Sequence, residues 1–372
     1  MKKLIIILMT AVLLVPLSCL SVSAEEDDPD YDVSAIYDSL SDEARQHMID
    51  LGADGADAYA LDKLSLSDAL DEIGKIASEN VSAPLRGLIT VIALLLLCSL
   101  LSAYQSSLSG DIRDTLNVAA ALGVACVLAS PAVAVIGEAS QVIDCASRLM
   151  IAFVPIMTVL MAGSGQAVGA SSYYAAVLAA GEGVNALASR VVIPFMNMFL
   201  ALGLVSNISP DIRLGGFSAM FAKTARWVLG FMMSVFTAVL SVRQAISGAL
   251  DRVSDRAVRF ALGSFVPVVG GALSEAYLTV RGSVNLLKSG VGIFVVIALL
   301  ITFLPLLLRV ALWLVALWVG KSVAEVLGLS QCAGLLDGVG MVLSTLLAVI
   351  LCVAAVYVIC AALALVMGGG AL

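Results

Sequence analysis

From residue 85 onward, long uncharged stretches of the chain alternate with short polar ones. A helix that spans a bilayer takes about 20 apolar residues, and several stretches approach or exceed that length. The pattern therefore predicts an all-α, polytopic helical membrane protein. The firmest predicted spans are Leu88–Leu108, Leu116–Ile136, Val191–Ile208, Val291–Leu308 and Met341–Val366.

Other apolar stretches do not make clear spans, because each is short or is interrupted by proline or glycine. We expect tilted spans, broken helices or interfacial segments here, and about six to eight crossings in all. A turn is expected at Gly163-Ser164-Gly165. The ambiguous stretches are Leu149–Ala162, Tyr173–Ser189, Phe260–Ser283 and Val310–Gly320. Trp227–Val242 is shorter than the firm spans but can extend into its flanks.

The first 24 residues have the pattern of a secretory signal peptide. Lys2 and Lys3 precede the apolar run Leu4–Leu17, and Val22-Ser23-Ala24 provides small residues at a cleavage site. An uncleaved signal anchor is the alternative, and Cys19 leaves lipidation open. The prediction is a signal peptide over residues 1–24.

Residues 25–84 form an acidic segment that we expect outside the membrane, before a polytopic membrane domain over residues 85–372. Between Glu25 and Glu79 the chain has 17 acidic side chains and three basic ones. Ser41 is placed to cap a short helix with Ala44 and Met48 on one face. A second short helix is expected over Leu66–Ala77.

Composition supports the membrane assignment and excludes several functions. Hydrophobic residues make up 61% of the chain and charged residues 13%, whereas soluble domains have about 25% charged residues. The net charge is −8, and the positive remainder beyond residue 84 suits loops at an anionic leaflet. We expect no nucleic-acid partner; the lipid bilayer is the partner that this composition predicts.

The residues that catalysis would need are largely missing. His47 is the only histidine, and it lies in the acidic segment. There is no Cys-x-x-Cys pair and no phosphate-binding Gly-x-x-x-x-Gly-Lys-Ser/Thr sequence. The sequence therefore predicts no catalytic residues, no metal site and no cofactor, and the protein is not expected to be an enzyme.

Two glutamates are candidates for lining a pore. Glu182 lies between Gly181 and Gly183 in an apolar region, and Glu275 follows Pro267 and two glycines. Ionisable groups near hydrocarbon normally face a bundle interior, a cavity or water. Ion or solute handling and a position in a loop or at the interface both remain open for each glutamate.

A basic amphipathic helix is expected over Arg243–Ala261. Its apolar residues form one stripe, while Arg252, Arg256 and Arg259 project from another face. This helix is predicted to lie at the cytoplasmic interface, in accordance with the positive-inside rule. It can serve as a lipid-headgroup anchor or as a docking surface for an acidic partner.

The stretch from Trp227 to Gly292 resembles the core of the stage III sporulation protein AE family. The most similar pieces are Phe265–Gly271, reading FVPVVGG, and Leu286–Gly292, reading LLKSGVG. The plan of signal peptide, short extracytoplasmic segment and polytopic body also resembles that family. Pro267, Gly270, Gly271 and Lys288 are singled out as motif positions.

The resemblance implies a function in endospore formation. The family is expected to supply a membrane component of a secretion-like channel, or feeding tube, that links mother cell and forespore and supports late forespore gene expression. Implied partners are other stage III sporulation membrane proteins and a cytoplasmic ATPase, and the implied location is the mother-cell-derived outer forespore membrane. A stand-alone secondary transporter and a purely structural scaffold are the alternatives.

Overall fold

The computed structural model describes residues 34–50, 74–76, 78–104, 110–208 and 270–366, together with scattered single positions between 220 and 256. Every regular element in these ranges is helical, as the sequence predicts. The signal peptide expected at residues 1–24 and the basic helix expected at Arg243–Ala261, except Arg256 within it, lie outside the described residues.

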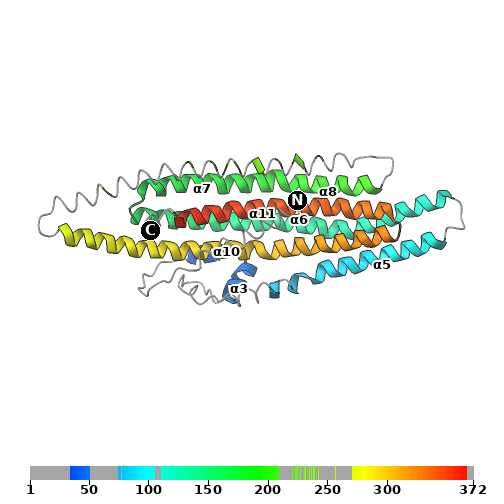
Figure 1. Ribbon diagram of the computed structural model, residues 1–372, viewed down its shortest axis with the longest axis horizontal. Helices are drawn as coiled ribbons and strands as arrows, with labels where there is room; N and C mark the ends of the chain where they lie inside the picture. The colour runs from blue at the N-terminus through cyan, green and yellow to red at the C-terminus, as the bar shows by residue number, and fades with distance from the viewer. Residues whose placement is uncertain are drawn as a thin grey trace.

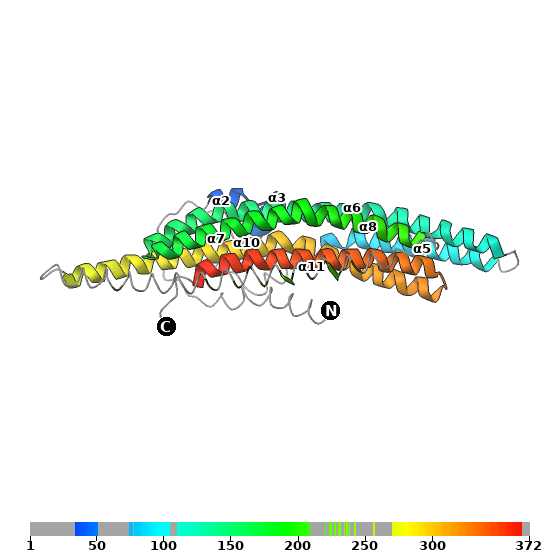
Figure 2. The same cartoon turned by 90° about the horizontal axis from the view of Figure 1, so that it is seen from above.

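Long helices run lengthwise side by side and form an elongated bundle (Figures 1 and 2). Helices α10 and α11 form its centre. Their apolar stretches are 67% and 72% buried, whereas the stretch over 74–100, which includes most of α5, is 17% buried. The helices of the bundle are α5 (Ser82–Tyr104), α6 (Gly110–Gly163), α7 (Ala167–Leu187), α8 (Ile193–Ile208), α10 (Gly270–Val326) and α11 (Ser330–Val366).

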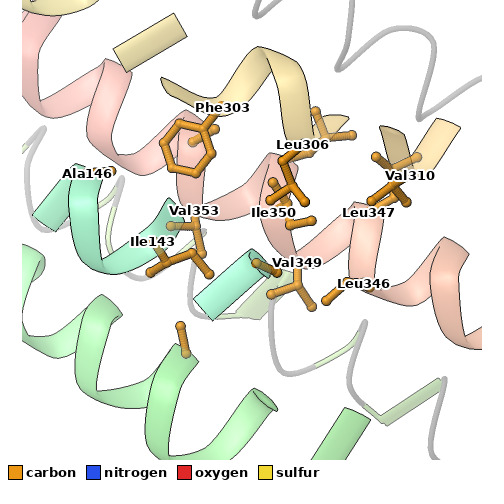
Figure 3. Close-up of a cluster of buried hydrophobic side chains, with 14 of the residues drawn as sticks. Ile143, Ala146, Phe303, Leu306, Val310, Leu346, Leu347, Val349, Ile350 and Val353 are labelled. Carbon is orange, nitrogen blue, oxygen red and sulfur yellow. The ribbon is translucent and has the colours of Figure 1, made fainter. Parts of the chain in front are cut away.

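The core lies where α6, α10 and α11 meet (Figure 3). Aliphatic side chains at helical spacing bring one apolar face of each helix to this junction, and their burial is the main favourable term for packing outside lipid. The buried residues drawn at the junction are Ile143 and Ala146 of α6, Phe303, Leu306 and Val310 of α10, and Leu346, Leu347, Val349, Ile350 and Val353 of α11.

Helices α6 and α10 continue through positions at which the sequence predicts breaks. The expected segments Leu116–Ile136 and Leu149–Ala162 belong to the single helix α6, which contains Pro131 and Pro155. Val291–Leu308 and Val310–Gly320 likewise belong to α10, which contains Pro305. A proline removes one backbone hydrogen bond and can kink a helix without ending it when neighbouring helices support the turn.

Helices α7 and α8 form one rod that contains a π-helical turn, η3 (Ala188–Val192). The predicted segments Tyr173–Ser189 and Val191–Ile208 are thus continuous. The turn comes just before Pro194, whose ring would clash with the carbonyl four residues earlier in a regular helix. A widened turn at this point accommodates the proline. No break occurs at Gly181–Gly183, which lies inside α7.

Two short connections depend on glycine. The predicted turn after α6 is present at Ser164–Gln166, where Gly165 has φ 83°. Gly328, with φ 74°, lies in the connection between α10 and α11. Glycine is favoured at both positions because other residues rarely adopt a positive φ.

Two amino-terminal helices, α2 (Ser34–Asp38) and α3 (Asp42–Asp50), pack on the side of the bundle, against α6 and α10 respectively. The predicted cap is present, since the Ala44 N–H donates to Ser41 Oγ at 3.2 Å. Ala44 and Met48 are buried, as their spacing predicts. The second expected helix, Leu66–Ala77, lies mostly outside the described residues.

Five helical stretches in the described ranges are long and apolar enough to cross a membrane. They lie within 74–100, 118–163, 167–205, 288–326 and 330–365. Trp227–Val242 and the chain from Phe260 to Val269 fall outside the continuous ranges, so the total of six to eight crossings stays a prediction.

Candidate functional site

Arg309 of α10 connects three parts of the chain. Its Nη1 donates to Glu138 Oε2 of α6 at 2.6 Å, and its Nε donates to Asn80 Oδ1 at 2.8 Å. Asn80, which precedes α5, is 7% exposed, and its amide donates to the Ile76 carbonyl oxygen at 2.9 Å. The planar guanidinium thus has a carboxylate on one side and an amide oxygen on the other.

This cluster is partly buried. The Arg309 and Glu138 side chains are 31% and 24% exposed, so their ion pair is screened less than a surface pair. Charge-assisted hydrogen bonds are stronger than neutral ones, and leaving one partner unpaired here would cost its desolvation. The cluster fastens the start of α5 to α6 and α10.

A second ionic group lies one to three turns further along α6. Asp144 pairs with Arg148 at 2.8 Å, and Asn185 of α7 donates its Nδ2 to Asp144 Oδ1 at 3.4 Å. This group lies about 9–15 Å from Glu138 along α6. We call the Arg309 cluster the polar layer; its members are Asn80, Glu138 and Arg309.

Charged residues also gather near the connection between α10 and α11. Lys321 Nζ lies 2.6 Å from Asp337 Oδ1 and 4.0 Å from Glu325 Oε1. Asp337 and Glu325 are exposed. This group marks the end of the bundle at which α10 turns into α11.

Lys288 is the one predicted motif residue whose side-chain surroundings the structure describes in full. It is 1% exposed and donates to Gln166 Oε1 at 3.5 Å, a long contact. Gln166 is 5% exposed and belongs to the turn between α6 and α7. Within the described part of the chain, no carboxylate pairs with the Lys288 ammonium.

The other predicted residues are placed less completely. Gly270 and Gly271 begin α10, while Glu182 and Glu275 lie in α7 and α10 with only their backbone described. Arg256 is helical and exposed. Pro267, Arg252 and Arg259 are outside the described residues. The pore-lining and docking assignments therefore stay predictions.

Sequence reasoning overlooked Arg309 and Glu138. Both are single ionisable residues that follow the ends of predicted spans, at Ile136 and Leu308. The available signal was that each stands alone in an apolar region, and an intramembrane ionisable residue usually has a partner. Their opposite charges could have suggested that they pair.

Two of the ionic contacts described above, Arg309–Glu138 and Lys321–Asp337, join neighbouring helices of the bundle. In the ranges that the structure describes, no group of three or more His, Cys, Asp or Glu side chains could hold a metal ion. The arrangement can orient helices and can keep a cation, Lys288, at the bundle's interior.

The described elements place the protein in the class of helical membrane proteins, because all of them are helices and five stretches are long and apolar enough to cross a membrane. A sequence model of the Stage III sporulation protein AE family matches residues 59–368. The match covers most of the chain and the whole bundle, so the chain belongs to the stage III sporulation protein AE family.

A relative is known in Bacillus subtilis (strain 168), where the similar protein is named Stage III sporulation protein AE. The two are 26% identical over 205 residues, which is 55% of this chain and 51% of the relative. The aligned part thus spans about half of the length of the curated relative. No solved structure is significantly similar to this chain.

Proposed function

We propose that this chain is a non-enzymatic membrane subunit of the channel complex that connects mother cell and forespore and is needed for late forespore gene expression. The observation that carries the proposal is the family match over residues 59–368, which includes every helix of the bundle. Under this proposal the protein sits in the outer forespore membrane and works with other stage III membrane proteins and a cytoplasmic ATPase.

The architecture is compatible with a subunit that acts through contacts between helices. Two ion pairs of the described residues join neighbouring helices of the bundle, Arg309 with Glu138 and Lys321 with Asp337. Such pairs fix helix positions, which an assembly subunit needs in order to present a defined surface. We therefore favour a role as a channel or platform subunit.

A stand-alone secondary transporter is supported less well. Transporters of that kind often have two matching broken helices in corresponding halves. The candidate pair in this sequence is Pro194–Asn207 and Pro267–Gly290. Pro194–Asn207 lies within the unbroken helix α8. It is therefore not a broken helix that could match Pro267–Gly290.

The test is a clean deletion of this gene in the endospore-forming organism that carries it, with reintroduction of the normal gene or of a variant. We expect the deletion to block heat-resistant spore formation and late forespore reporter expression, and the normal gene to restore both. Normal reporter expression in the deletion strain would contradict the proposal.

A paired variant separates conduction from scaffolding. Glu182→Gln with Glu275→Gln removes two carboxylates with almost no change in side-chain volume. Loss of reporter expression with normal protein levels would support a conducting role for these carboxylates. Full expression would favour a scaffold. Recovery of sister membrane proteins with an affinity-tagged chain tests assembly separately.

A further inference from the structure

Helices α6 and α10 are too long to lie within one bilayer. With 54 and 57 residues at 1.5 Å per residue, they measure about 81 and 86 Å. The hydrocarbon core of a bilayer is about 30 Å thick, and about 40–45 Å with its headgroups. A large part of each helix must therefore lie outside the membrane.

The polar layer divides the bundle into two halves. We call the part between Arg309 and the α10–α11 connection the hairpin half; it includes α5, α8 and the beginning of α6. The part between Glu138 and the Ser164–Gln166 turn is the turn half. Glu138 lies 25 positions before Gly163, so the turn half of α6 measures about 38 Å.

Charged groups show that water reaches the turn half. Helices α2 and α3 pack along it, and the Cys145 thiol of α6 contacts the Ser39 carbonyl oxygen at 3.8 Å. Asp42 and Glu43 of α3 are exposed, and the Asp38 side chain is 75% exposed. Exposed carboxylates are costly in hydrocarbon, so lipid tails cannot surround this region.

Arg148 gives independent evidence for the same conclusion. It lies on the turn half of α6, about 15 Å beyond Glu138 along the helix. Its side chain is 63% exposed, and its partner Asp144 is 48% exposed. The water-exposed region therefore extends along the turn half from the polar layer.

The hairpin half exposes large apolar side chains along two helices. Helix α5 exposes Ile89, Leu97 and Leu100, and α8 exposes Phe195 and Met198. Apolar side chains of this size suit contact with lipid tails.

The hairpin half has about the length of a bilayer core. Arg309 lies 19 positions before Gly328 in the α10–α11 connection, so this part of the chain measures about 28 Å, close to the about 30 Å of a hydrocarbon core. Lys321, paired with Asp337, lies about 18 Å beyond Arg309. Long cationic side chains near the end of a span extend toward the headgroups.

We propose that the bilayer surrounds only the hairpin half, with lipid hydrocarbon as the partner of α5, α8 and the part of α6 between Leu122 and Val133. The polar layer lies at one face of the membrane and the α10–α11 connection at the other. The turn half projects from the membrane on the side of α2 and α3. This inference does not rest on the proposed function, and its test does not involve sporulation.

The test uses the full chain in lipid nanodiscs with a hydrophobic diazirine dissolved in the lipid. After illumination, carbene adducts are located by peptide mass spectrometry. We expect adducts on α5, α8 and around Leu122 of α6, and at least tenfold fewer around Val159 of α6 and Tyr174 of α7. Equal labelling around Leu122 and Val159, which are both exposed on the same helix, would overturn the proposal.

A thiol experiment provides the complementary readout. Cys126 is exposed on the hairpin half of α6. The substitution Val159→Cys adds an exposed thiol on the turn half of the same helix. A water-soluble maleimide should modify V159C in nanodiscs but spare Cys126, and should modify both after denaturation. If the maleimide does not modify V159C and no carbene adducts form around it, protein covers that face, and the proposed bilayer position is still supported. If the maleimide does not modify V159C and carbene adducts do form there, lipid covers that face and the proposal is overturned.

Discussion

The indole of Trp313 in α10 packs directly on the backbone of Gly87 in α5. A Cβ atom at residue 87 would lie 2.5 Å from Trp313 Cη2 and 2.9 Å from Cζ3, closer than carbon atoms can approach without a shift. Trp313 is 5% exposed, so its ring has little room to move. The contact between α5 and α10 at this level requires glycine.

Gly87→Ala is expected to lower the free energy of unfolding by up to about 2 kcal/mol. Overpacking costs about 1–3 kcal/mol, and alanine recovers about 1 kcal/mol of helix propensity. Denaturant unfolding in detergent, followed by circular dichroism, measures the difference. The control is Gly340→Ala in α11, where no atom lies within 4 Å of the added carbon; equal stabilisation by both changes would contradict the prediction.

Removing the charge of Glu138 is expected to destabilise the bundle by about 1–3 kcal/mol, because Arg309 would lose its anionic partner while remaining partly buried. A double-mutant cycle with Glu138→Gln and Arg309→Gln isolates the pair, and the expected coupling energy is about 1 kcal/mol or more.

The matched control for that cycle is Asp337→Asn, which removes the anion from the more exposed pair with Lys321. Exposed pairs contribute about 0–1 kcal/mol, so this change should have a smaller effect. A coupling energy near zero between Glu138 and Arg309 would show that the pair does not fasten the helices.

Lys288→Met should leave the stability of the bundle unchanged or raise it. The substitution keeps much of the side-chain volume, and it removes a buried charge whose described contact is one long hydrogen bond to Gln166. The measurement is thermal unfolding in detergent, alongside the sporulation assay. A stable but inactive variant would assign Lys288 a functional role; a fall in unfolding temperature of several degrees would contradict the prediction.

Acid is expected to loosen the contact between α3 and Lys75. Hydrogen bonds from Lys75 and then from Gln46 hold the pKa of Asp50 below its ordinary value of 3.8. A carboxyl whose pKa is lowered by folding stabilises the folded state above its unfolded pKa, and this contribution is lost as the pH falls through the lower folded value. The hydrogen-exchange protection factors of residues 42–50, which compare the measured rate with the intrinsic rate at each pH, should therefore fall below about pH 4. The Asp50→Asn variant should show a weaker pH dependence; an identical profile would exclude Asp50 as the cause.

The helical character of the chain and the cap at Ser41 could be predicted because each depends on local sequence. Uncharged stretches such as Met341–Val366 favour a helix because a backbone surrounded by lipid has to satisfy its hydrogen bonds within the segment. Ser41 precedes Ala44 by three residues, the spacing at which a hydroxyl meets a free N–H of the first turn. These features do not depend on what the segment packs against.

The lengths of the helices could not be predicted in the same way. Pro155 and Arg309 both have the local signature of an interruption. In the structure, α6 continues through Pro155, and Glu138 and Asn80 supply the partners of Arg309. Those partners lie 171 and 229 residues away along the chain, so inspection of the local sequence cannot reveal them.

The π-helical turn at Ala188–Val192 makes the α7–α8 rod unusually sensitive to its residue count. Each residue of an α-helix advances the side-chain direction by about 100°, so removal of one residue from this turn would rotate all of α8 by that angle relative to α7. Phe199 and Leu200, which are buried, would leave the core while Tyr173 in α7 stayed in place. A single-residue deletion would therefore change which residues of α8 face the core, although it leaves the downstream amino-acid sequence unchanged.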